Sequence, residues 1–197
     1  MEARTLLMST VWAVLFGFYG IRLPFFVVWK ELNKMKKVGI LMGSESDLPV
    51  VEKAIDKLKE FGVPYEVHVY SAHRTPEEAR EFSASAAENG FGVIIAAAGM
   101  AAHLAGAVAA NTLLPVIGIP VKASCFDGMD ALLSTVMMPP GMPVATVGVN
   151  ASVNAALLAI QIIALSDQRL AKKLRASRED ATAKVLKSNK KIEKQFN

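Results

Sequence analysis

Short apolar runs that alternate with helical segments constrain the fold of this 197-residue chain more than any other feature. Each run is almost free of charge and ends at a glycine, a proline or a polar turn, which is typical of parallel strands buried on both faces. The stretches between the runs carry apolar residues at helical spacing. The expected strands are residues 38–43, 65–70, 92–99, 116–120 and 144–147.

Strands that alternate with helices predict an α/β fold in which a parallel sheet is covered on both faces. We expect a three-layer α/β/α sandwich, flavodoxin-like or Rossmann-like, followed by a long C-terminal helix. The first helix should close near Gly62, and its apolar stripe consists of Val51, Ala54, Ile55, Leu58 and Phe61. The second should begin at Thr75, with Pro76 in the first helical position and Glu78 completing a capping box. Later helices are expected at residues 103–110, 130–137 and 152–165, and the second should run to about residue 89.

The C-terminal segment is strongly basic. Residues 168–197 hold ten lysines and arginines against three acidic residues, whereas the whole chain has a net charge of +4. A basic tail can bind nucleic acid, but Phe196 is the only aromatic residue in this one. A solvated helix is therefore the better interpretation, with sparse apolar contacts at Leu170, Leu174, Val185 and Ile192.

The single cysteine, Cys125, excludes a disulfide framework within the chain and any CxxC metal motif. A lone thiol suits a reducing cytoplasm, and we expect Cys125 to be a small packed residue. Asp127 and Asp130 follow it closely, and we interpret both as helix caps. No spacing of histidine, cysteine and carboxylate side chains suggests a metal site.

Residues 5–21 are apolar enough for a signal or an anchor, yet they lack a basic leading region and a clear cleavage site. We expect translation to begin at Met35, or the extension to be dispensable; membrane attachment through residues 5–29 is the alternative. The expected organisation is an extension at residues 1–35, a catalytic α/β domain at 36–166 and a basic helix at 167–197.

Three polar segments follow the first three expected strands. They read GSESD, SAHRTP and AAAGMAAHL. Ligands of open α/β sheets bind outside the carboxyl ends of the strands, so these segments should meet at one edge. GSESD offers a tight turn at Gly43, the hydroxyls of Ser44 and Ser46, and helix N–H groups for a phosphate; Asp47 suits ribose hydroxyls. An ordinary serine and aspartate helix cap explains the same residues.

SAHRTP places a histidine beside an arginine. Arg74 suits an anionic group, and His73 can gain and lose a proton near neutral pH. The alternative is a loop histidine bonded to a carbonyl. Of the chain's other two histidines, His103 is expected to orient a loop and His68 to be structural.

Several motifs together resemble one enzyme family. In order, they are GILMGSESD, SAHRTPEEAREF, AENGFGVIIAAAGMAAHLAG, LPVIGIPV and MPPGMPVATV. Over residues 36–181 they are similar to the N5-carboxyaminoimidazole ribonucleotide mutases, the class I PurE family. The resemblance implies an isomerase of de novo purine (IMP) synthesis, which moves a carboxylate from an exocyclic nitrogen to C4 of an aminoimidazole ribonucleotide. It implies no cofactor, a cytoplasmic location and a homo-octamer, which the excess apolar surface of residues 152–165 also favours.

The resemblance also assigns residues to roles. His73 falls on the family's essential histidine, and the substrate-binding positions are Ser44, Ser46, Asp47, Ser71, Arg74, Gly99, Ala101, Ala102 and His103. Arg74 distinguishes the mutases from the related carboxylases that use free carbon dioxide, which typically have lysine there. That carboxylase and a non-catalytic ribonucleotide-binding protein are the alternatives.

This chain departs from the family pattern in the alanine-rich loop. Ala97, Met100 and Ala105 replace glycine, glycine and proline, and Met137 replaces a glutamine. Met100 adds a long side chain beside the expected pocket, and its backbone is strained if φ is positive there.

Overall fold

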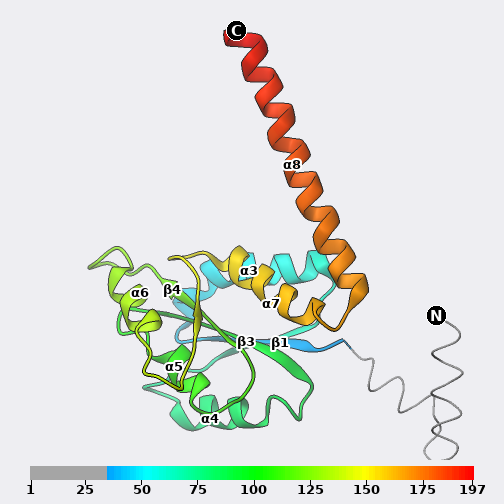
Figure 1. Ribbon diagram of the computed structural model, residues 1–197. Coiled ribbons are helices and arrows are strands. Elements are labelled where there is room, and N and C mark those ends of the chain that lie inside the picture. The colour runs from blue at the N-terminus through cyan, green and yellow to red at the C-terminus, as the bar shows by residue number, and fades with distance from the viewer. Residues whose placement is uncertain (1–34) are drawn as a thin grey trace, which may run out of the picture. The chain divides into compact units, whose positions relative to one another are not determined.

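The computed structural model describes residues 35–197 (Figure 1), of which residues 36–197 form one compact unit. The extension before Met35, with its possible anchor at residues 5–29, lies outside the described residues. No helix between residues 35 and 197 combines the length and the apolar character that crossing a bilayer requires.

A five-stranded parallel sheet in the order β2-β1-β3-β4-β5 forms the centre of the fold, as predicted. Its interior is apolar because β1 and β4 are buried almost throughout and β3 along most of its length. The strands are β1 (Lys37–Met42), β2 (Tyr65–Val69), β3 (Phe91–Gly99), β4 (Val116–Val121) and β5 (Ala145–Thr146). The edge strand β5 is shorter than predicted, and Thr146 instead donates its hydroxyl to Thr135 O of the neighbouring helix, at 3.3 Å.

Helices cover both faces of the sheet (Figure 1). Helices α3 and α7 pack together on one face, α4 and α5 lie on the other, and α6 packs against β4 and β5. This arrangement confirms the predicted three-layer sandwich. The helices are α3 (Leu48–Phe61), α4 (Pro76–Ser85), α5 (Leu104–Ala109), α6 (Met129–Val136), α7 (Ser152–Ala164) and α8 (Gln168–Phe196), with a short 3-10 turn η1 (Glu45–Asp47) before α3.

The predicted stripe of α3 is correct for four of its five residues, and the fifth, Ile55, is half-buried. Val51, Ala54, Leu58 and Phe61 are buried, and Gly62 ends the helix with a φ of 72°, a left-handed conformation that glycine adopts without a steric penalty. The capping box predicted at the start of α4 is wrong. Thr75 makes no side-chain cap; its hydroxyl accepts the Ser71 N–H at 2.8 Å and so closes the preceding loop.

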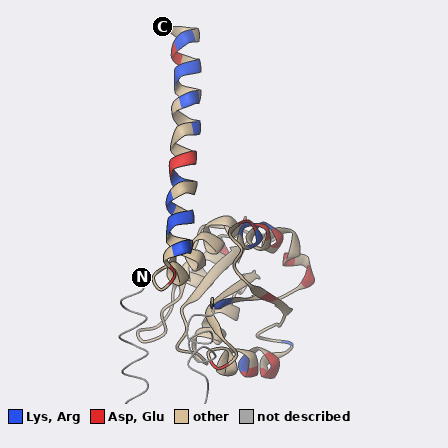
Figure 2. Cartoon of the chain, turned by 90° about the vertical axis from the view of Figure 1, so that its right-hand side faces the viewer, with Lys and Arg blue, Asp and Glu red and all other residues tan. Residues whose placement is uncertain are grey.

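Helix α8 extends beyond the α/β body as one continuous helix of 29 residues (Figures 1 and 2). Leu170 is buried and Leu174 half-buried, but Val185 and Ile192 are 68% and 53% exposed. The predicted contacts are therefore correct at the start of the helix and wrong farther along it, where the helix has left the body. Lysines and arginines recur along much of its length (Figure 2).

Candidate active site

The serine-rich turn after β1 is closed by its own polar groups. Ser44 N–H donates to Asp47 Oδ2 at 3.1 Å, and Ser46 N–H donates to Ser44 Oγ at 3.3 Å. The helix-cap interpretation of GSESD is thus correct for Ser44 and Asp47. The turn does not require glycine at Gly43, where an added Cβ would meet only ordinary contacts. Ser44 and Ser46 both line the cleft described below.

Asp47 is almost buried, with 7% of its surface exposed. Burial raises the pKa of this carboxyl group, and the N–H groups of Ser44 and Gly43 and the charge of Arg74 only partly oppose the shift. Keeping this carboxyl group ionised in the folded protein therefore costs desolvation free energy, which is typical of ionisable groups at ligand-binding sites.

The SAHRTP loop follows β2 and is folded around Ser71. Ser71 Oγ accepts the N–H groups of His73 and Arg74, at 3.4 and 3.3 Å. Arg74 then reaches across to the first loop, where its Nη2 donates to Gly43 O at 2.7 Å. One arginine thus connects the serine-rich turn to the histidine-bearing loop.

The third loop brings a second histidine to the first. His73 Nε2 lies 2.8 Å from His103 Nδ1, and the two rings are 5.0 Å apart in an edge-to-face arrangement. One of the facing nitrogens must donate while the other accepts. The sequence analysis expected His103 only to orient a loop; the signal it did not use is that both histidines follow strands that flank β1.

The alanine-rich loop passes close to the end of β4. A Cβ added at Gly99 would lie 3.1 Å from Val121 O, so the backbones approach closely there. Met100 has a φ of 56°, which confirms the suspected strain. Met100 is 63% exposed and is one of the residues that line the cleft described below, as the prediction of a long side chain beside the pocket requires.

These three loops and the end of β4 enclose a cleft of about 680 Å³. The cleft is lined by His73 and by eight of the nine predicted binding residues, namely Ser44, Ser46, Asp47, Ser71, Arg74, Gly99, Ala101 and His103. Ala102 is buried behind the loop and does not line it. The sequence analysis missed Lys122 and Ala123, because the segment after β4 lacks a recognisable motif.

Other predicted residues lie elsewhere. His68 stacks on Tyr70, with ring centroids 5.0 Å apart, in agreement with a structural role. Cys125 is exposed, so its prediction as a packed residue is wrong. Asp127 is not a cap but pairs with Lys122. Asp130 lies in the first turn of α6, but that helix has no side-chain cap, so the cap prediction is wrong for both residues. Within residues 35–197, no cluster of three histidine, cysteine or carboxylate residues could hold a metal ion.

The fold and the cleft define an α/β protein that brings a serine-rich turn, an arginine, an almost buried carboxyl group and a histidine pair together at the carboxyl edge of its sheet. Residues 37–184 match the AIR carboxylase family, and the chain belongs to that family.

Its relatives include mutases and carboxylases. The chain is 54% identical over 146 residues to N5-carboxyaminoimidazole ribonucleotide mutase of Pyrococcus abyssi, covering 74% of this chain and 84% of that protein. It is 54% identical over 157 residues to the mutase of Methanocaldococcus jannaschii, covering 80% and 98%. Phosphoribosylaminoimidazole carboxylase of Saccharomyces cerevisiae is 55% identical over 146 residues, which cover 73% of this chain and 26% of that protein. The crystal structure of Treponema denticola PurE matches with a TM-score of 0.72 and 32% identity, over 80% of this chain and 98% of that one.

Met100→Gly should raise the free energy of unfolding by about 0.5–1 kcal/mol, because glycine relieves the positive φ and only part of that gain is lost to the greater freedom of the unfolded chain. The measurement is urea unfolding. Met137→Gly is the matched control: Met137 is also exposed but has a φ of −83°, so the same change should destabilise the protein. A loss of stability at both positions would contradict the assignment of strain to Met100.

Asp47→Asn should become more stable relative to the unchanged protein as pH rises. The folded pKa of Asp47 lies above its ordinary value of 3.8, so the native state binds more protons than the unfolded state between the two values. The unchanged protein therefore loses stability as pH rises through that window, and asparagine removes the loss. Urea unfolding at pH 4 and pH 7 measures the effect; a stability difference independent of pH would contradict it.

Proposed function

We propose that this chain converts N5-carboxyaminoimidazole ribonucleotide to 4-carboxy-5-aminoimidazole ribonucleotide in de novo purine synthesis. The observation that carries the proposal is the His73–His103 pair, which shares one cleft with the serine-rich turn and Arg74. Membership of the AIR carboxylase family and the mutase relatives support it. His73 is the proposed catalytic residue.

The proposed binding roles follow the chemistry of each loop. The Ser44 and Ser46 hydroxyls and Arg74 take the phosphate, and Asp47 accepts hydrogen bonds from the ribose. Ser71 contributes indirectly, since its hydroxyl already holds the backbone of the loop. Gly99 and Ala101, with the buried Ala102 behind them, form a small-residue wall at the reacting base.

The reaction needs one proton to be delivered and one to be recovered. Protonation of the exocyclic nitrogen breaks its bond to the carboxylate and releases carbon dioxide. The electron-rich C4 then forms a bond to that carbon dioxide, and loss of the C4 proton restores the aromatic ring. The proton given to nitrogen equals the proton taken from carbon, so His73 ends in its starting state.

The histidine pair suits this exchange because its facing nitrogens hold one hydrogen between them. When His73 carries the extra proton, Nδ1 is available to the substrate while Nε2 donates to His103. After transfer, His73 Nδ1 is the acceptor that C4–H requires. His103 thereby fixes which nitrogen of His73 faces the base.

A carboxylase that uses free carbon dioxide is the second candidate, favoured by the carboxylase relatives. Arg74 supports the mutase assignment, since lysine is typical of that position in the carboxylases that resemble this family. A purely binding function is less well supported, because a cleft of about 680 Å³ remains although Met100 lines it. Turnover of N5-carboxyaminoimidazole ribonucleotide without added bicarbonate identifies the mutase. Conversion of the uncarboxylated ribonucleotide only when bicarbonate is added identifies the carboxylase, and binding with neither reaction identifies a purely binding protein.

His73→Asn should lower the turnover of N5-carboxyaminoimidazole ribonucleotide by about 10²- to 10⁴-fold, the usual contribution of an acid–base group. Binding of the ribonucleotide, measured by calorimetry, should persist because the phosphate and ribose contacts remain. His68→Asn is the matched control, since His68 lies outside the cleft. Equal turnover in the unchanged protein and His73→Asn would remove His73 from the chemistry.

We also propose a homo-octamer in the cytoplasm, and α8 supplies a surface for its assembly. Apolar side chains recur along α8 at two positions in every eleven residues, a spacing that keeps them in one nearly straight stripe. The stripe consists of Leu170, Leu174, Ala181, Val185, Ile192 and Phe196. Only Leu170 and Leu174 are shielded from solvent by the rest of their own chain. We propose that a second copy of the chain packs against the remaining residues of the stripe.

Val185→Asp combined with Ile192→Asp should reduce the assembled mass in light scattering, because two charges would then be buried in the stripe. Ala183→Asp places a charge on the opposite side of the same helix and should leave the mass unchanged. An unchanged mass in the double variant would exclude this stripe as an assembly surface.

A further inference from the structure

Lys122 is a second cationic residue of the cleft, and none of the loop motifs in the sequence predicted it. It follows β4 directly, where Val121 pairs in register with Gly99, and it is one of the residues that line the same cleft as Arg74 and the two histidines. Among the described residues that line the cleft, Arg74 and Lys122 are the only lysines and arginines, and Asp47 is the only carboxylate.

The charge of the substrate exceeds what Arg74 alone can match. A phosphate monoester carries about −1.5 to −2 at neutral pH, and the carboxylate adds a further unit. The positive charge of Arg74 is partly neutralised by the neighbouring Asp47, and one of its N–H groups already donates to Gly43 O. A bound trianion of this kind therefore leaves negative charge without a protein partner unless a second cation approaches it.

The backbone of Lys122 is fixed, whereas its ammonium group can change its partner. Its backbone N–H donates to Asn150 Oδ1 at 2.9 Å, which anchors the end of β4. Its ammonium lies 2.6 Å from Asp127 Oδ1, in an ion pair whose side chains are 54% and 84% exposed. Exposed pairs of this kind contribute little to stability, so a ligand that offers a better anion can replace the aspartate.

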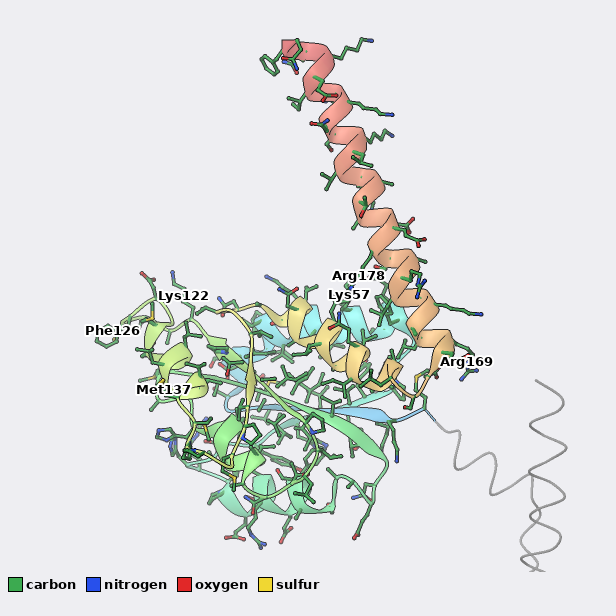
Figure 3. The ribbon with its side chains drawn as sticks, viewed as in Figure 1. Lys57, Lys122, Phe126, Met137, Arg169 and Arg178 are labelled. Carbon is green, nitrogen blue, oxygen red and sulfur yellow. The ribbon has the colours of Figure 1, made fainter. Side chains whose placement is uncertain are left out.

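We propose that Lys122 is a substrate-binding residue whose ammonium leaves Asp127 for an anionic group of the ribonucleotide. Asp127 then acts as a placeholder that keeps the lysine at the mouth of the cleft before substrate arrives. The loop from Lys122 to the start of α6, which also carries the exposed Phe126 (Figure 3), is the element that this exchange releases. The inference rests on the proposed function of the same cleft.

Steady-state kinetics with N5-carboxyaminoimidazole ribonucleotide test the exchange. Lys122→Met should raise KM about tenfold or more, in keeping with the loss of a charge-assisted hydrogen bond. Lys122→Arg should restore much of that loss. Asp127→Asn should lower KM, by about two- to threefold, because the lysine no longer has a competing partner.

Two matched controls isolate the cleft. Lys172→Met removes an exposed lysine from α8, and Asp56→Asn removes the carboxylate of an exposed ion pair on α3; neither lines the cleft, and both should leave KM unchanged. A KM for Lys122→Met within twofold of the unchanged protein would overturn the proposal. An equal rise in KM for Lys122→Met and Asp127→Asn would overturn it too, since the pair would then be needed intact.

Calorimetry identifies which anion is bound and separates this inference from the function. If Lys122→Met weakens 4-carboxy-5-aminoimidazole ribonucleotide but not the uncarboxylated ribonucleotide, the lysine binds the carboxylate. Equal weakening of both assigns it to the phosphate, and weakening of neither rejects it. Absence of turnover in the unchanged protein would reject the mutase function, while these affinities would still decide the role of Lys122.

Discussion

The register of β1 with its two neighbours is the constraint on which the site depends. Met42, the last residue of β1, pairs with Val69 on one side and with Ala97 on the other. The three strands therefore end at nearly the same level, and the loops that follow them meet over the end of β1. Because parallel strands all point the same way, residues far apart in the sequence reach one cleft without any long connection.

Arg74 connects the loops that meet at this edge of the sheet. Its hydrogen bond to Gly43 O joins the first two loops, and its charge stands beside Asp47, whose carboxyl group burial would otherwise protonate more readily. The third loop is joined by the contact between His73 and His103. The cleft is thus preorganised by contacts among the residues that line it, so a change at any one of them affects its neighbours.

The sequence predicted what local pattern determines. Buried apolar runs predicted the strands, the stripe on α3 predicted its packed face, and the motifs at strand ends predicted most residues of the cleft. Contacts that depend on the folded geometry could not be predicted from the sequence. Thr75 has the sequence of a helix cap but closes a loop, and Asp127 has that of a cap but pairs with Lys122, because in each case a partner brought by the fold competes with the local one.

The same limit explains why Lys122 was missed and what its environment implies. The first three loops carry recognisable motifs, but a single lysine after a strand is indistinguishable in sequence from a surface charge. Only the pairing of Val121 with Gly99 places it beside the alanine-rich wall. Asp127 and Asn150, the two residues that hold Lys122, both have a left-handed backbone, a conformation that aspartate and asparagine adopt more readily than other non-glycine residues. The two residues hold different parts of one exposed lysine: Asn150 fixes its backbone, while Asp127 pairs with an ammonium group that a bound anion can take over.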